Sequence, residues 1–299
     1  MISRYTHKDL TWIDLEAPTK EEVLQVMEEY SIHPLVADEL LSPTLRPKVD
    51  VYNNLIYLIL HFPTIFHKHG SQTEQEVDFI IGKNFLITTH YNVVDPLHDF
   101  SKIFEVNSIL DKSNIAEHGG YLFYYLIREL YQDLNIELDH IYNTLEKVES
   151  KIFSGEEVKM VEAISKVSRD LLNFKEAISP HKEVLESFEI AGEKFFGKEF
   201  TYYLNDISGE YYKINSMLEG HRDTLTELRE TNDSLLTTKT NETMKVFTVL
   251  AALALPAAII ASVFGMNVQT PINNFWDVVV AIIIFTIILF VFFKYKKWI

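Results

Sequence analysis

The stretch TMKVFTVLAALALPAAIIASVF, residues 243–264, decides the fold class of the whole chain. Its one charge, Lys245, lies near the start. A helix of this length spans about 30 Å, which matches the hydrocarbon thickness of a bilayer. A second apolar run, residues 275–293, has Asp277 as its one charge. The sequence therefore predicts two C-terminal transmembrane helices, joined by a short connection at 265–274.

Basic residues at the ends of these runs predict the orientation of the two helices. They are Lys239 and Lys245 around the start of the first run, and Lys294, Lys296 and Lys297 in a basic tail, residues 294–299. The connection at 265–274 has neither Lys nor Arg. The chain is expected in an inner or plasma membrane. Because cytoplasmic flanks carry an excess of basic residues, both termini are expected on the cytoplasmic side.

Several pieces of sequence around the two runs carry a family resemblance. They are NETMKV (241–246), Pro256, FGMN (264–267) and FKYKKWI (293–299). Together they resemble the CorA family of divalent-cation channels. The resemblance implies a pentameric funnel with an α+β cytoplasmic domain, in which helices flank a small mixed sheet, then a very long stalk helix and two transmembrane helices. It also implies a selectivity filter at Gly265, Met266 and Asn267, although an isolated Asn at this place also fits an ordinary helix C-cap.

The connection between the two runs departs from the family pattern and leaves the transported ion open. Classical magnesium channels of the family carry Met-Pro-Glu-Leu here, whereas residues 268–275 are VQTPINNF, without an acidic residue. Mg²⁺ is the first expectation, with Co²⁺ or Ni²⁺ as further ions. A Zn²⁺ transporter on the same scaffold, proton-coupled or not, is the alternative, because the zinc branch also lacks this element. A second alternative is a non-conducting, membrane-tethered coiled-coil scaffold or cation sensor.

The charge balance and the residue types exclude several function classes. The chain has 27 Lys and Arg against 43 Asp and Glu, and every acidic residue except Asp277 precedes residue 243. This acidity disfavours nucleic acid and anionic lipid as partners and suits cations, although a solubilising surface explains it equally well. The absence of cysteine excludes disulfides and thiolate metal sites. The sequence has no nucleotide-hydrolysis or nucleophile motif, so an enzyme is not expected.

Periodicity divides the part before the first apolar run into three predicted pieces: a sheet subdomain at 1–110, a helical hairpin at 111–190 and a stalk helix at 191–242. Within the first piece, a capping box at Thr19 and Glu22 starts a helix. Strands are predicted at 10–15 and between 49 and 90, and helices at 95–109 and 121–152. A further helix is predicted after Ser154-Gly155, to about residue 188, with a kink at Pro180.

A heptad seam and the first apolar run predict one helix of roughly 60 residues from 204 to 264, about 90 Å long. The seam consists of Leu204, Ile207, Tyr211, Ile214, Leu218, His221, Leu225, Leu228, Asn232 and Leu235. Its alternating spacing of three and four is typical of a coiled coil, which needs a partner helix. The seam indicates association, whereas the number five comes from the family resemblance alone.

A nearly uncharged stripe on the predicted membrane part of this helix is the candidate pore lining. It consists of Asn241, Met244, Thr248, Leu255, Ala258 and Ser262. Mg²⁺ dehydrates reluctantly, so a neutral pore with hydrogen-bonding groups suits a cation that keeps its water. Met244 and Leu255 would form apolar constrictions. A stripe that only packs helix on helix is the alternative.

The family resemblance also implies a regulatory site for a divalent cation, such as Mg²⁺, between neighbouring subunits. The matching positions are Asp38 and Glu39, after His-Pro-Leu-Val, and Asp206 on the stalk helix; three solvated acids are the alternative. Arg128 stands where relatives can add an acidic residue to this cluster. We hypothesise that Arg128 pairs with Asp38 or Asp206 and partly replaces the bound cation.

Overall fold

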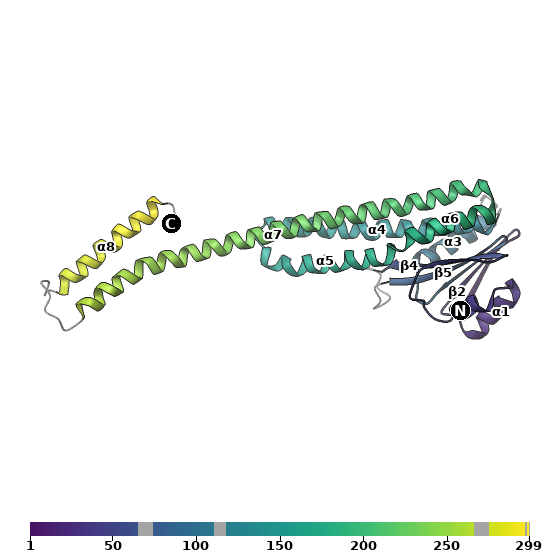
Figure 1. The fold of residues 1–299 in the computed structure, drawn as a ribbon, viewed down its shortest axis with the longest axis horizontal. Coiled ribbons are helices and arrows are strands. Elements are labelled where there is room, and N and C mark those ends of the chain that lie inside the picture. The colour runs from purple at the N-terminus through teal and green to yellow at the C-terminus, as the bar shows by residue number, and fades with distance from the viewer. Residues whose placement is uncertain (65–73, 111–117, 266–274, 297, 299) are drawn as a thin grey trace.

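The computed structural model describes residues 1–64, 74–110, 118–265, 275–296 and 298. Its strands are β1 (Ile2–His7), β2 (Leu10–Glu16), β3 (Lys48–Val51), β4 (Leu55–Pro63), β5 (Glu74–Gly82) and β6 (Phe85–His90). Its helices are α1 (Lys20–Tyr30), α2 (Pro34–Glu39), α3 (Asp95–Leu110), α4 (Gly119–Phe153), α5 (Glu157–Ile178), α6 (His181–Phe196), α7 (Thr201–Phe264) and α8 (Phe275–Tyr295), with a 3-10 turn at Lys198–Phe200. The molecule is elongated, with the sheet at one end and α8 at the other (Figure 1).

The six strands form one mixed sheet in the order β1-β2-β6-β5-β4-β3. β2 and β6 are parallel, and the other neighbours are antiparallel. Both faces are covered. In β4, Ile56 and Leu58 join the core shared with α3, α4 and α7, whereas Tyr57 and Ile59 join the core under α1 and α2. Because both faces are buried, β4 is a continuous apolar run. The predicted mixed sheet flanked by helices is confirmed.

Local signals in the sequence explain where the helices on the α1 and α2 face begin. The side chain of Thr19 accepts a hydrogen bond from the Glu22 amide, and the Glu22 carboxylate accepts one from the Thr19 amide, which confirms the predicted capping box. In the same way, Nδ1 of His33 accepts from the Leu35 amide at 3.2 Å and caps α2. This cap orients the short helix that carries Asp38 and Glu39.

Helix α4 begins against the sheet at a glycine that no larger residue can replace without movement. The amide of Gly119 donates to the carbonyl oxygen of Lys83 at 2.7 Å. A Cβ atom added at Gly119 would lie 2.3 Å from the carbonyl oxygen of Gly82 and 2.5 Å from that of Phe85. The missing side chain therefore allows the first turn of α4 to contact the β5–β6 hairpin directly.

The helix predicted from Ser154-Gly155 to about residue 188 is interrupted at Pro180, as expected, and the interruption separates two helices, although Ser179 and Pro180 keep helical dihedral angles. α5 ends at Ile178, and α6 starts at His181. Proline has no amide hydrogen, and its ring clashes with the carbonyl of the preceding turn, so a helix tends to end at this residue. Residues 119–196 therefore form three helices, α4, α5 and α6, which pack lengthwise along α7 (Figure 1).

Helix α7 has 64 residues and is continuous from Thr201 to Phe264, which confirms the predicted long helix. The predicted seam is covered within the chain. Eight of its ten residues are buried: Leu204, Ile207, Tyr211, Ile214, Leu218, Leu225, Leu228 and Asn232. They pack against α4, α5 and α6, which all contact α7. The partner helices that the seam needs are thus in the same chain, and the expectation that it indicates association between copies is wrong.

An ion pair ties the tip of the bundle to α7 one turn before the apolar run. Nζ of Lys239 donates to the carbonyl oxygen of Gly155 at 3.1 Å and pairs with the carboxylate of Glu157. Gly155 has φ of +95°, a conformation that favours glycine in the turn between α4 and α5. This turn is therefore fixed to α7 four residues before Thr243.

Candidate functional site

Among the residues that the structure describes, two helices are long and apolar enough to cross a membrane: α7, in its C-terminal part, and α8. Of the apolar window of each helix, 6% is buried in α7 and 0% in α8. α8 turns back along the end of α7 (Figure 1), and Val249 on α7 and Phe293 on α8 are buried. A core helix of a soluble protein would be mostly buried, so the exposure favours a membrane environment.

The predicted stripe on α7 lies on the side of the helix away from α8. Asn241, Met244, Thr248, Leu255, Ala258 and Ser262 are all exposed in the chain. The buried or half-buried positions from Val249 to the end of α7 follow another line: Val249, Ala252, Leu253, Pro256, Ala257, Ile260 and Phe264. At 3.6 residues per turn, the centres of the two lines are about 150° apart around the helix. The stripe therefore has no packing role against α8.

The hydroxyl of Thr248 shows what such a stripe offers to an ion. Its Oγ1 donates to the carbonyl oxygen of Met244, one turn earlier, at 2.8 Å. A hydroxyl that donates in this way keeps lone pairs, which can accept a hydrogen bond from the water of a hydrated cation. The stripe thus combines hydrogen-bond acceptors with the apolar side chains of Met244 and Leu255 and carries no charge.

The predicted selectivity filter is described only at its first residue. The amide of Gly265 donates to the carbonyl oxygen of Ala261 at 3.0 Å and ends α7 with helical φ of −78°. A Cβ atom added here would lie 3.2 Å from the same oxygen. Met266 and Asn267 lie outside the described residues, and their roles stay a prediction.

Asp206 lies in a cluster with two side chains of α4. The hydroxyl of Tyr124 donates to Oδ2 of Asp206 at 2.7 Å, and Nη1 of Arg128 donates to the Tyr124 hydroxyl at 3.0 Å. Nε of Arg128 is 3.9 Å from Oδ2 of Asp206. Burial and the hydrogen bond to Asp206 raise the pKa of Tyr124 to about 12, so the hydroxyl is a neutral donor. Of the two predicted partners of Arg128, the chain brings Asp206 to it.

Asp38 and Glu39 lie on α2, in different surroundings. Nζ of Lys48 lies 2.9 Å from Oε1 and 2.7 Å from Oε2 of Glu39, and 2.8 Å from Oδ2 of Asp50. Partial burial opposes the charge of Lys48, but the hydrogen bonds to Asp50 and Glu39 raise its pKa. Asp38 is exposed. Across the described ranges, no ion pair links Asp38 or Glu39 to Asp206 or Arg128.

Sequence reasoning missed two members of these clusters. Tyr124 bridges Arg128 and Asp206, and only the packing of α4 on α7 brings these residues together. Lys48 pairs with Glu39, and the basic turn Arg46-Pro47-Lys48 after α2 was a signal for it. In the part of the chain that the structure describes, no three His, Asp or Glu side chains gather closely enough to hold a metal ion.

The fold defines a class of protein: one with an α+β domain, one long helix and two C-terminal apolar helices that are long enough to cross a membrane. The chain belongs to the family of CorA-like Mg²⁺ transporter proteins, which it matches over residues 7–296. The cobalt/magnesium transport protein CorA of Thermotoga maritima is 28% identical over 96% of this chain and 83% of its own length. The protein of the same name in Methanocaldococcus jannaschii is 24% identical over 97% of this chain and 92% of its own length.

A solved structure shares the whole architecture. The complete structure of the CorA magnesium transporter from Methanocaldococcus jannaschii matches with a TM-score of 0.84, and the match covers 99% of this chain and 93% of that one. The two sequences are only 21% identical in this comparison, so the structural likeness shows a shared fold and nothing further. The predicted order of mixed sheet, long helix and two C-terminal apolar helices is confirmed.

Proposed function

We propose that the chain forms a membrane channel for hydrated divalent cations, with Mg²⁺ as the main substrate and Co²⁺ as a second. The observation that carries the proposal is the uncharged stripe on α7, which is exposed and turned away from α8. Family membership supports it. The membrane potential drives entry, because it contributes about 2.3 kcal/mol per charge per 100 mV.

A stripe on one helix encloses no pore, so the proposal requires several copies around an axis. The resemblance to the family supports five. Both termini then lie in the cytoplasm, in keeping with the basic residues Lys239 and Lys294 at the ends of the two spans. Met244 and Leu255 form rings that close the pore by excluding water, and Asn267 forms a ring at the outer mouth that holds the cation's water shell.

Ion flux into liposomes tests this proposal. Purified full-length protein is reconstituted with a Mg²⁺-sensitive dye inside, and a negative internal potential is imposed. We expect Mg²⁺ influx that falls sharply in Asn267→Ala and persists in Asn274→Ala, a control in the same connection. Absence of flux, or flux equal in both variants, rejects the channel.

The same assay distinguishes the alternative ion. Zn²⁺ flux that follows a pH gradient, with little Mg²⁺ flux, would establish the zinc transporter instead. Both relatives described above are named as cobalt/magnesium transport proteins, which gives zinc less support. A protein that conducts neither ion while cytoplasmic Mg²⁺ still alters its assembly would be the non-conducting sensor.

The gating proposal starts from the partners that the candidate carboxylates already have. Glu39 pairs with Lys48, and Asp206 contacts Tyr124 and Arg128. A cation between Asp38 or Glu39 of one subunit and Asp206 of the next would compete with these partners. Arg128 therefore supplies part of the positive charge that a bound cation would bring, and closure of the pore depends only weakly on cytoplasmic Mg²⁺.

A further inference from the structure

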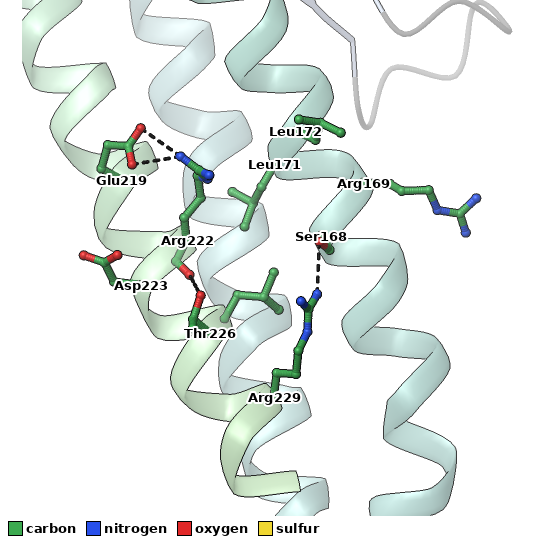
Figure 2. Close-up of a pocket in the computed structure, with 10 residues that line it drawn as sticks. Ser168, Arg169, Leu171, Leu172, Glu219, Arg222, Asp223, Thr226 and Arg229 are labelled. Carbon is green, nitrogen blue, oxygen red and sulfur yellow. Dashed lines mark hydrogen bonds and ion pairs between the residues drawn. The ribbon is translucent and has the colours of Figure 1, made fainter. Parts of the chain in front are cut away.

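A groove between α5 and α7, remote from the stripe and from Asp206, has a cavity of about 330 Å³. Figure 2 shows its walls: Ser168 and Arg169 come from α5, and Arg222, Thr226 and Arg229 come from α7. Leu171 and Leu225 lie on its floor and are buried. The groove is open to solvent along one side.

Basic residues are concentrated in this groove although the chain has a net charge of −16. Three of the six arginines in the chain line the cavity: Arg169, Arg222 and Arg229. Arg222 and Arg229 are seven residues apart, so they lie on the same face of α7, about 10 Å apart along the axis. Lys175 of α5 lies near Arg222, because both pair with Glu219.

Two carboxylates, Glu219 and Asp223, line the groove with the three arginines, so part of this positive charge is unmatched. Glu219 serves two cations: Arg222 Nη1 lies 3.1 and 2.9 Å from its two oxygens, and Lys175 Nζ lies 2.9 Å from one of them. The hydrogen bond from Lys175 and the charge of Arg222 keep the pKa of Glu219 low, so it stays ionised. Nη2 of Arg229 donates to the neutral hydroxyl of Ser168 at 3.2 Å.

Within the described residues, neither Arg229 nor Arg169 forms an ion pair with a carboxylate. Arg169 extends from the rim toward solvent, whereas Arg229 points across the groove from α7 to α5 (Figure 2). Guanidinium groups present a planar fork of donors that matches phosphate oxygens. The groove therefore offers at least one free arginine fork between two helices.

The position of the groove excludes one source of phosphate. Arg229 precedes Thr243, the first residue of the apolar run, by 14 residues of continuous helix, or about 21 Å. The headgroup layer on each side of the hydrocarbon core is only about 5–8 Å thick. A phospholipid headgroup does not reach Arg229, so a ligand must be soluble.

We propose that this groove binds a soluble triphosphate, either inorganic tripolyphosphate or the triphosphate of a nucleotide, through Arg229 and Arg222 of α7. A single phosphate is much shorter than the spacing of these two arginines along the helix, whereas a chain of phosphates can contact both. Arg169 at the rim adds to the positive potential. Bound in this way, the anion links α5 to α7 through Ser168 and Arg229. The proposal does not depend on the transport function.

Calorimetric titration of the full-length protein in detergent tests the proposal directly. Tripolyphosphate, ATP and inorganic phosphate are titrated separately in EDTA, so that chelation of divalent cations contributes nothing. We expect saturable binding of tripolyphosphate at millimolar concentrations or below, and much weaker binding of phosphate. ATP that binds more tightly than tripolyphosphate identifies the nucleotide as the ligand, and equal binding identifies the phosphate chain alone.

The decisive variant is Arg229→Gln, because within the described residues this side chain donates one hydrogen bond, to Ser168 at the surface. Loss of its charge should weaken tripolyphosphate binding roughly tenfold or more, as expected for a charge-assisted hydrogen bond. Arg46→Gln, an exposed arginine outside the groove, should bind like the wild type. Circular dichroism checks that both variants fold. No saturable binding, or equal binding by the two variants, overturns the proposal.

Discussion

The two halves of α7 differ in where they find their packing partners. In the first half, the apolar seam is buried against α4, α5 and α6 of the same chain. In the second half, α8 covers one side, and the stripe from Asn241 to Ser262 stays exposed. One continuous helix thus has a face that is completed by folding and another that is left for something outside the chain.

This difference shows what helical periodicity can and cannot indicate. A regular spacing of three and four predicts that a face is covered, but it does not tell whether the cover belongs to the same chain. The seam has the stronger pattern and is satisfied internally. The stripe has the weaker pattern, yet its exposure makes it the better candidate for contact between copies or with an ion pathway.

Truncation of a buried seam residue should give the largest effect. Leu218 is fully buried, so Leu218→Ala should lower the free energy of unfolding by about 2–5 kcal/mol through lost burial and a cavity. Leu255 is 61% exposed in the chain, and Leu255→Ala should change it by less than about 0.5 kcal/mol. Denaturant unfolding followed by circular dichroism measures both. Equal losses would mean that the two halves of α7 are packed alike.

Substitution of a stripe residue should instead change ion flux. Leu255→Ser places a hydroxyl in the proposed apolar constriction and should raise resting Mg²⁺ influx several-fold, because a wetted constriction conducts. Leu250 is 57% exposed but lies off the stripe, so Leu250→Ser is the matched control and should leave the flux unchanged. Liposome flux measures both variants. A larger effect at Leu250 would place the ion pathway on another face.

The charge of Arg128, which lies beside Asp206 near the start of α7, should control how the proposed pore responds to internal Mg²⁺. Arg128→Asp removes the positive partner of Asp206 and adds a carboxylate, so closure should become steeply dependent on internal Mg²⁺. Tyr124→Phe removes the bridging hydroxyl but keeps the arginine charge, and its response should stay closer to the wild type. Flux at graded internal Mg²⁺ compares the two. A response of Arg128→Asp like that of the wild type would refute the replacement of a cation by Arg128.

The smallest expected effect concerns the ion pair at the boundary between the two halves. The hydrogen bond from Lys239 lowers the pKa of Glu157, so the pair stabilises the folded state above the ordinary glutamate pKa of about 4.3. This contribution is lost as the pH falls through the lowered pKa of the folded state. Lys239→Met should therefore flatten the decrease of the melting temperature below about pH 4.3. An unchanged pH profile would show that the pair does not stabilise the fold.

Local signals made much of the fold predictable. The capping box at Thr19 and Glu22 and the apolar run of β4 each depend on neighbours within a few residues. Strand β1 was not predicted, because Ile2–His7 has little alternation and is recognisable only by its pairing with β2. The break at Pro180 was located correctly but interpreted as a kink, since periodicity alone does not show whether a second helix restarts in line.

The candidate site was less predictable than the fold, because it depends on contacts between distant elements. Arg128 had two predicted partners, and only the packing of α4 on α7 selects Asp206. Lys48 lies only nine residues after Glu39, and the basic turn Arg46-Pro47-Lys48 signals a cation here, but the pairing itself depends on the path of the chain between α2 and β3. The relation of Asp38 to Asp206 depends on how copies meet, and Asn267 lies outside the described residues, so both remain predictions.

The continuity of α7 also makes it a lever. About 38 Å of helix lies between Lys239, which pairs with the turn between α4 and α5, and Phe264 at the far end of α7. If Lys239 acts as the fulcrum, a tilt of only 5° moves Phe264 by about 3 Å, roughly the diameter of one water molecule. Small side-chain rearrangements that leave the packing of α4, α5 and α6 unchanged would then suffice to admit or expel a layer of water near Phe264.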